Sequence, residues 1–144
     1  MPDDADKSRN DPRHRQGRFT ARPRKESETG LHDNRVRQTL DDMASLYNEA
    51  QQIVDEGPDA FFAAENLRTR RAATAIIIHL SDAAHRPEID SMRTQYLDVD
   101  WQGLRGQRNW LSHKYDDIDF NAVWRTISQV FPRERRLLGL DPHR

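Results

Sequence analysis

The helical spacing of the apolar residues is the feature that most limits how this chain can fold. The first apolar stripe, with steps of four and three residues, consists of Val36, Leu40, Met43, Tyr47, Ala50 and Val54. Such steps place all of these side chains on one face of a helix with 3.6 residues per turn. We expect Asp33 or Asn34 to cap the start of this helix and Gly57-Pro58 to end it.

Further segments are also helical in pattern. The run AATAIIIHL predicts the most buried helix, over residues 65–84, with Phe61 and Phe62 plugging the bundle from the turn before it. A short helix or ordered loop follows Pro87, a third helix starts near Asp98 or Asp100, and a fourth starts after Asp119 and breaks or kinks at Pro132. Since no segment shows strand alternation, we predict an all-α antiparallel bundle of four to five helices.

The domain is expected to span residues 31–140, and residues 1–30 differ from it in composition. This first segment is rich in charged residues and proline, with Phe19 as its only bulky apolar residue after Met1. It cannot bury enough surface to offset its ordering entropy, so we predict a disordered tail. The tail is either a weak RNA- or partner-binding arm or simply solvated. The small core favours dimerisation.

Composition excludes several classes of protein. The chain has 144 residues and no cysteine, which rules out disulfides and thiolate chemistry. Its net charge of -1 means that nucleic-acid binding would need a local basic patch. No apolar run reaches the roughly 20 residues that span a membrane, and no secretory signal follows the start. We therefore expect a cytoplasmic protein without membrane contact.

The segment RNWLSHKY, residues 108–115, concentrates polar chemistry at the end of the third helix. On a helix, Arg108 falls into a core-facing stripe with Trp101, Leu104, Leu111 and Tyr115. A buried guanidinium without a partner is very costly, so this position indicates a cleft or a nearby acceptor. Asn109 and His113 share the neighbouring side of the helix.

These side chains suit metal-independent RNA cleavage. A histidine can take the proton of a ribose 2′-hydroxyl or protonate a leaving 5′-oxygen, and an arginine can hold a phosphate and stabilise its transition state. An asparagine can orient either group. The alternative is structural, because Arg and His near a helix C-terminus also complement the helix dipole.

The motif RN-x3-H-x-Y, preceded by DWQGLRGQ and followed by DDIDFNAVWRTI, resembles the HEPN-domain ribonuclease toxins, and within them the HepT-like branch. The resemblance covers residues 34–138. It implies a dimeric all-α bundle whose two motifs face a shared cleft. It also implies an endoribonuclease that needs no cofactor and cleaves tRNA or mRNA. The expected partner is a minimal nucleotidyltransferase antitoxin, which can transfer AMP to the tyrosine of the motif.

Carried over to this chain, the resemblance makes Arg108 and His113 catalytic, Asn109 supporting and Tyr115 the modification site. The chain departs from the family in two places. Gly106-Gln107 separate Arg105 from Arg108, and we choose Arg108 because Asn follows it and His lies five residues on. Asp82 stands where many relatives carry the Glu of a Gly-Glu-Ala segment, which leaves its role open.

Other residues have two possible roles each. Arg68, Arg70 and Arg71 either line the path of the RNA or form a solvated face. His79 is expected to be a hydrogen-bonded core histidine, and Trp110 to serve in packing or a dimer contact rather than in base stacking. The alternative for the whole chain is a non-catalytic HEPN module that binds nucleotides or proteins.

Overall fold

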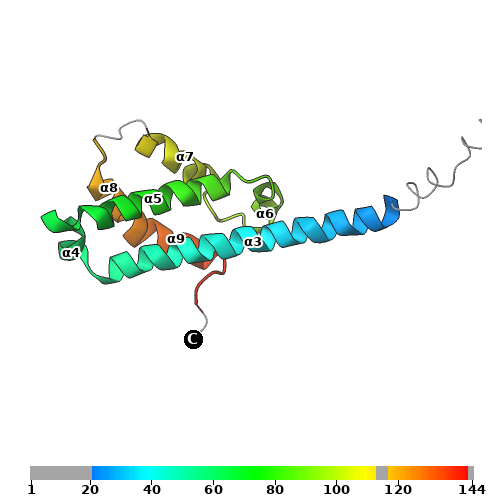
Figure 1. The fold of residues 1–144 in the computed structure, drawn as a ribbon, viewed down its shortest axis with the longest axis horizontal. Coiled ribbons are helices and arrows are strands. Elements are labelled where there is room, and N and C mark those ends of the chain that lie inside the picture. The colour runs from blue at the N-terminus through cyan, green and yellow to red at the C-terminus, as the bar shows by residue number, and fades with distance from the viewer. Residues whose placement is uncertain (1–20, 113–116, 143–144) are drawn as a thin grey trace, which may run out of the picture. The chain divides into compact units, whose positions relative to one another are not determined.

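The computed structural model describes residues 21–112 and 117–142. All regular structure in these ranges is helical, which confirms the predicted all-α class (Figure 1). Of the described residues, 21–35 belong to one unit, and those from Val36 onward form a second. The bundle and the candidate site lie in the second unit.

The first helix of the described ranges, α3 (Ala21–Asp55), begins earlier than predicted. Asp33 and Asn34 lie inside it rather than at its N-cap, and residues 21–30, assigned above to the tail, are helical. Ala, Arg, Lys and Glu in this segment are among the best helix formers. Pro23 falls in the first turn, where its missing N–H costs no helical hydrogen bond.

The end of α3 is where the sequence predicted it. Gly57 follows the helix with a φ of 93°, a left-handed conformation that favours glycine. The short helix α4 (Pro58–Phe62) and the 3-10 turn η1 (Ala64–Asn66) then reverse the chain. Phe61 is buried and its ring centroid lies 5.0 Å from that of Trp124, but Phe62 is largely exposed, so only Phe61 plugs the core.

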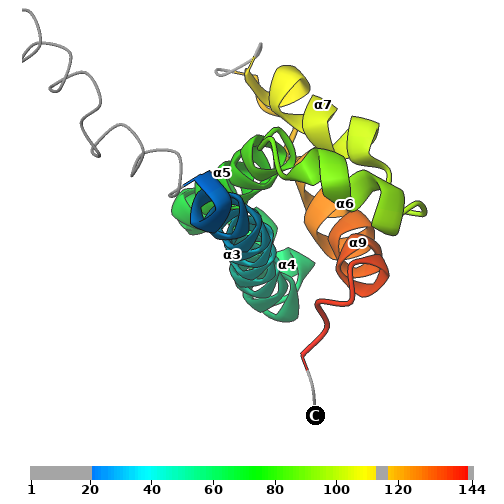
Figure 2. The same ribbon diagram turned by 90° about the vertical axis from the view of Figure 1, so that its right-hand side faces the viewer.

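Helix α5 (Leu67–Ala84) lies between α3 and α7 (Trp101–Ser112), as Figures 1 and 2 show. Its buried side chains are Ala73, Thr74, Ile76, Ile77, Leu80, Ser81, Ala83 and Ala84. The opposite face is not covered, and His79 lies exposed on it. The expectation of a core histidine was therefore wrong, because α5 is apolar over most of its circumference but not all of it.

Helix α7 starts directly after Asp100, in keeping with the predicted start near Asp98 or Asp100, and Asp100 caps it. Its Oδ1 accepts a hydrogen bond from the backbone N–H of Gly103 at 2.9 Å. A Cβ atom at residue 103 would overlap the Asp100 carboxylate in its present position, so this carboxylate would have to shift if residue 103 were not glycine. The predicted short helix is α6 (Ile89–Gln95), which connects α5 to this point.

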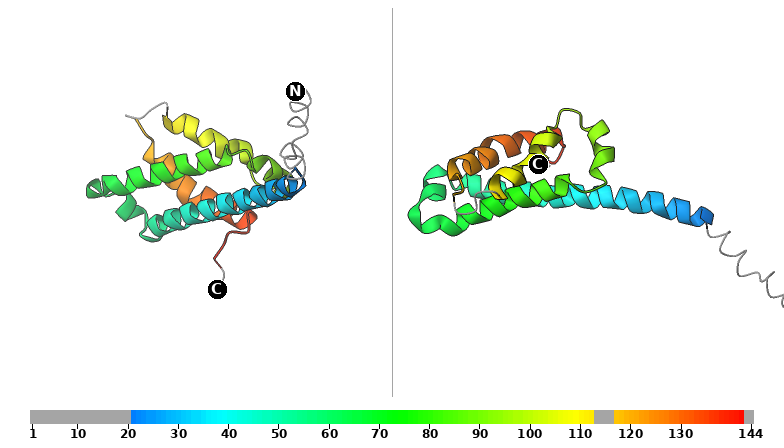
Figure 3. Two further views of the ribbon diagram at one scale, coloured as in Figure 1. Left: turned by 45° about the vertical axis from the view of Figure 1, so that its right-hand side comes forward. Right: turned by 90° about the horizontal axis from the view of Figure 1, so that it is seen from above.

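The last helical run consists of α8 (Phe120–Arg125), the π-helical turn η2 (Thr126–Val130) and α9 (Phe131–Leu137). Asp119 caps it as predicted, accepting from the backbone N–H of Asn121 at 3.0 Å. Pro132 does not end the run, and both views in Figure 3 show it continuing in line. The wide turn before Pro132 accommodates the proline, which lacks an N–H and crowds the preceding turn of a regular helix.

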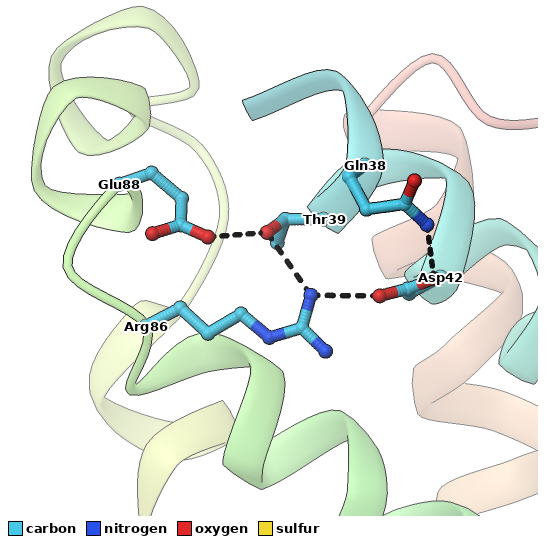
Figure 4. Close-up of polar contacts among 5 residues, drawn as sticks. All are labelled: Gln38, Thr39, Asp42, Arg86 and Glu88. Carbon is cyan, nitrogen blue, oxygen red and sulfur yellow. Dashed lines mark hydrogen bonds and ion pairs between the residues drawn. The ribbon is translucent and has the colours of Figure 1, made fainter. Parts of the chain in front are cut away.

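A polar network fastens α3 to the end of α5 (Figure 4). The Thr39 hydroxyl is fully buried, donates to Glu88 Oε1 at 2.8 Å and accepts from Arg86 Nη1 at 3.1 Å. Arg86 also pairs with Asp42 at 2.8 Å, and this hydrogen bond lowers the pKa of the Asp42 carboxyl. These contacts fix the C-terminal end of α5, the helix on which the candidate site is built.

A buried carboxyl group lies in the core between α3 and α9. The side chain of Glu134 is 6% exposed, and its Oε2 accepts a hydrogen bond from the Tyr47 hydroxyl at 3.2 Å. Burial, together with the nearby charge of Asp100, raises the pKa of Glu134 from 4.5 to about 7. Burial likewise raises the pKa of Tyr47.

Within the described ranges, no helix is long and apolar enough to cross a membrane.

Candidate functional site

The arginine of the RNWLSHKY segment is paired across two helices. Arg108 lies on α7, and its Nη1 is 2.5 Å from Oδ1 of Asp82 on α5. The pair is open to solvent, with 55% of the Arg108 side chain and 43% of the Asp82 side chain exposed. The carboxylate therefore holds the guanidinium at the surface, where an anion can reach it.

Arg108 is not part of the buried stripe of α7, in contrast to the prediction. The residue that lies there between Leu104 and Leu111 is Gln107, which is 8% exposed. Gln107 is three residues after Leu104, so its side chain lies on the same face of the helix as Leu104. Burying its neutral amide costs less free energy than burying a charged guanidinium. The Gln107 Oε1 atom has no hydrogen-bond partner among the residues that the structure describes.

Ser81 fixes the position of α7 against α5. Its buried hydroxyl donates to the backbone carbonyl of Arg105 at 2.8 Å and accepts from the backbone N–H of Arg108 at 3.3 Å. The small side chains of Ala83 and Ala84 are also fully packed at this end of α5. This close approach sets the register of the two helices and so brings Asp82 opposite Arg108.

The alternative arginine of the motif has a structural role. Arg105 donates from Nε to the Ala84 carbonyl at 2.8 Å, near the C-terminal end of α5, and its Nη2 lies 3.5 Å from Asp90 Oδ1. These bonds commit its guanidinium to joining α5, α6 and α7. The geometry is thus in keeping with the choice of Arg108 over Arg105.

The remaining residues of the motif are only partly described. Asn109 is exposed on α7, next to Arg108. Trp110 is 39% exposed, so it is not sealed in the core, and its expected role in a dimer contact remains a prediction. His113 and Tyr115 lie outside the described residues, and their predicted roles remain predictions.

The three arginines of α5 divide into two kinds. Arg68 and Arg71 are exposed and have no acidic partner within the described ranges. Arg70 is instead a structural residue, because its Nη1 donates to the carbonyls of Phe61 at 2.8 Å and Ala63 at 2.7 Å. Of the three, only Arg68 and Arg71 are available to bind phosphate.

A cleft of about 400 Å³ opens between α5 and the start of α8. Its lining includes Arg71, Thr74, Ala75, Ile78, Ile118 and Phe120. On α5, Arg71, Ala75, Ile78 and Asp82 follow one another at steps of four, three and four, so the cleft and the Arg108–Asp82 pair share one face of that helix.

The role of Ser81 was not predicted from the sequence, and that of Asp82 was left open. A small polar residue beside two alanines, at the end of an apolar helix, was a signal of close helix approach. Nothing in the sequence indicated which residues of α7 would lie opposite. No three His, Asp or Glu side chains in the described ranges come close enough together to hold a metal ion.

An all-α bundle that displays an arginine at the exposed end of a helix, followed by Asn and then His at five residues, has the features of a HEPN-type ribonuclease domain. The ribonuclease HepT-like family model matches residues 43–138, about two thirds of the chain, and the chain belongs to that family. Membership suggests ribonuclease activity and hence an RNA substrate. No solved structure matches the chain.

Proposed function

We propose that this protein is a metal-independent endoribonuclease and the toxin of a toxin–antitoxin system. One observation carries the proposal. The guanidinium of Arg108 is exposed on the turn of α7 that precedes His113 in the sequence, and Asp82 of α5 holds it there. Family membership supports the class of reaction, and the Arg108 geometry supports the assignment of the arginine.

In the proposed reaction the RNA supplies its own nucleophile. His113 takes the proton of a ribose 2′-hydroxyl, the 2′-oxygen attacks the adjacent phosphorus, and the bond to the 5′-oxygen breaks. The leaving 5′-oxygen receives a proton, which gives a 2′,3′-cyclic phosphate and a 5′-hydroxyl end. Arg108 binds the non-bridging oxygens and stabilises the charge that develops on the phosphorane, and Asn109 orients the phosphate or the hydroxyl.

Asp82 acts as a positioning residue in this proposal. A guanidinium has five N–H donors, and the hydrogen bond to Asp82 uses Nη1, so donors remain for a phosphate. Without the carboxylate, the long side chain would sample many rotamers at this exposed position. Asp82 thereby takes over, with a shorter side chain, the place of the family's glutamate.

The proposed antitoxin acts on the same surface. A nucleotidyltransferase that transfers AMP to Tyr115 would add a negatively charged phosphate to the segment that follows Arg108. That phosphate would compete with the RNA for the arginine and repel the RNA backbone.

Arg68 and Arg71 contribute RNA contacts, and two copies of the chain form a homodimer in the cytoplasm.

Induced expression of the wild-type chain, without any antitoxin, should stop bacterial growth. The Arg108→Ala variant should restore growth, because it removes the phosphate-binding group and leaves the fold intact. Arg93→Ala, which removes an exposed arginine of α6, is the matched control and should remain toxic. Colony counts after induction, with protein levels checked by immunoblot, give the measurement.

A binding-only HEPN module makes the opposite prediction. It would be harmless at the same protein level, and Arg108→Ala would make no difference to growth. That result would reject the toxin assignment. Co-expression of a nucleotidyltransferase antitoxin should suppress the toxicity of the wild type.

A further inference from the structure

We propose that the cleft between α5 and α8 holds one base of the RNA strand that is cleaved at Arg108. The proposal rests on the proposed ribonuclease function and adds to it a defined base-binding subsite. It is carried by three features of the cleft: its apolar walls, the positive charge of Arg71 and its place on the same face of α5 as Asp82.

The walls suit a planar, largely apolar group. Ile78, Ile118 and Phe120 line the cleft, and all three are partly buried rather than sealed in the core. Its volume of about 400 Å³ falls within the usual range of small-ligand sites, roughly 300–1,000 Å³. A base inserted between these side chains would bury both faces against apolar surface, as stacking platforms for single strands do.

The aromatic wall of the cleft also contacts a cation. The guanidinium carbon of Arg70 lies 5.4 Å from the centroid of the Phe120 ring. Arg70 itself is anchored by the carbonyls of Phe61 and Ala63. A ring fixed in this way loses little conformational entropy when a base contacts it, which favours binding.

The charge of the cleft also fits a nucleotide. Arg71 contributes a guanidinium to the lining, and among the described residues no carboxylate is part of it. A second cleft of similar volume, lined by Asp98, Asp100, Glu134 and Arg133, has a predominantly acidic lining. A phosphate should therefore be attracted to the first cleft and repelled by the second.

The position of the cleft connects it to the proposed reaction site. Ile78 and Asp82 are one turn apart on α5, about 6 Å along the helix axis. A strand whose phosphate binds Arg108 can thus place a neighbouring base against Ile78. Arg71, two turns further from Asp82, would then contact the backbone phosphate beyond that base.

The test measures binding of a fluorescein-labelled, single-stranded RNA to the full chain by anisotropy. All binding variants carry His113→Ala, so that the RNA is not cleaved during the measurement. Ile78→Trp fills the cleft and should weaken binding about tenfold, the scale of losing one stacked base. Val130→Trp fills the acidic cleft and is the matched control, which should bind as its parent does.

Abasic RNAs identify the base. For the His113→Ala parent, removing the base at one position of the RNA should weaken binding about tenfold. For the variant that also carries Ile78→Trp, binding should no longer depend on the base at that position. Arg71→Ala changes only an exposed side chain, so it keeps the test valid if Ile78→Trp fails to fold. It should reduce the slope of log affinity against log salt by about one.

Two results would overturn the inference. One is an abasic series with no sensitive position, together with an unchanged salt slope for Arg71→Ala. The other is displacement of the labelled RNA by AMP as effectively as by unlabelled RNA, which would mark a site for free nucleotides. Cleavage of the same RNA by the wild type distinguishes failure of the base subsite from failure of the ribonuclease function. If the wild type cleaves the RNA, only the base subsite is rejected. If it does not, both proposals are rejected.

Discussion

The Arg108→Ala variant is expected to cleave RNA about 10²–10³-fold more slowly than the wild type, the usual loss when one transition-state donor is removed. The guanidinium lies exposed on α7 and is oriented by Asp82, so its removal takes away phosphate binding rather than packing. Single-turnover cleavage of a labelled RNA at saturating protein measures this loss in the chemical step.

The stability of the Arg108→Ala variant should change little. Both partners of the Arg108–Asp82 pair are well exposed, and such solvent-screened pairs contribute at most about 1 kcal/mol. Arg105→Ala makes the useful contrast, because it removes the hydrogen bond to the Ala84 carbonyl and should lower the free energy of unfolding instead. Undiminished cleavage by Arg108→Ala would reject the assignment of the motif arginine.

The second large effect is a loss of stability as the pH rises from 5 to 8. Unfolded Glu134 releases its proton near pH 4.5, whereas the folded protein retains it up to about pH 7. Between these values the folded state binds the extra proton, so the free energy of unfolding falls with rising pH and levels off above pH 7. The total loss from this group is about 3 kcal/mol.

Glu134→Gln should remove this pH dependence, since an amide does not titrate. Urea unfolding at pH 5 and pH 8 gives the change for each protein, and over this interval the variant should lose roughly 2–3 kcal/mol less than the wild type. The groups around Glu134 are Tyr47 on α3, Asp98 and Asp100 before α7, and Arg133 on α9 itself. Glu56→Gln, at an exposed position, is the control, and equal pH dependence in all three proteins would contradict the account.

Much of the fold was predictable because its signals are local. The apolar stripe from Val36 to Val54, the cap at Asp119 and the stop at Gly57 each depend on a few neighbouring residues, and the structure confirms them. The start of α3 was not predictable in the same way. The other helices were predicted from the spacing of their apolar residues. Residues 21–30 are polar and have no apolar stripe, so this spacing could not indicate a helix there.

The candidate site was harder to predict, because it depends on how two helices meet. The spacing of apolar residues placed Arg108 in the core stripe. Gln107 and Arg108 are three and four residues after Leu104, so either of them could lie on the buried face. Because burying a charge costs more free energy than burying an amide, Gln107 is the buried residue. The partner of Arg108 lies 26 residues earlier in the chain, and only the register set by Ser81 brings Asp82 to it. Such a register is a property of packing and not of either segment alone.

The most direct test of the central claim is RNA cleavage by the purified protein in excess EDTA, with the antitoxin absent and Tyr115 confirmed unmodified by mass spectrometry. The account predicts that the wild type cleaves RNA to ends bearing a 2′,3′-cyclic phosphate. It also predicts that His113→Ala, which lacks the general acid–base, is at least about a hundredfold slower. Equal cleavage by both proteins, or no cleavage by the unmodified wild type, would contradict it.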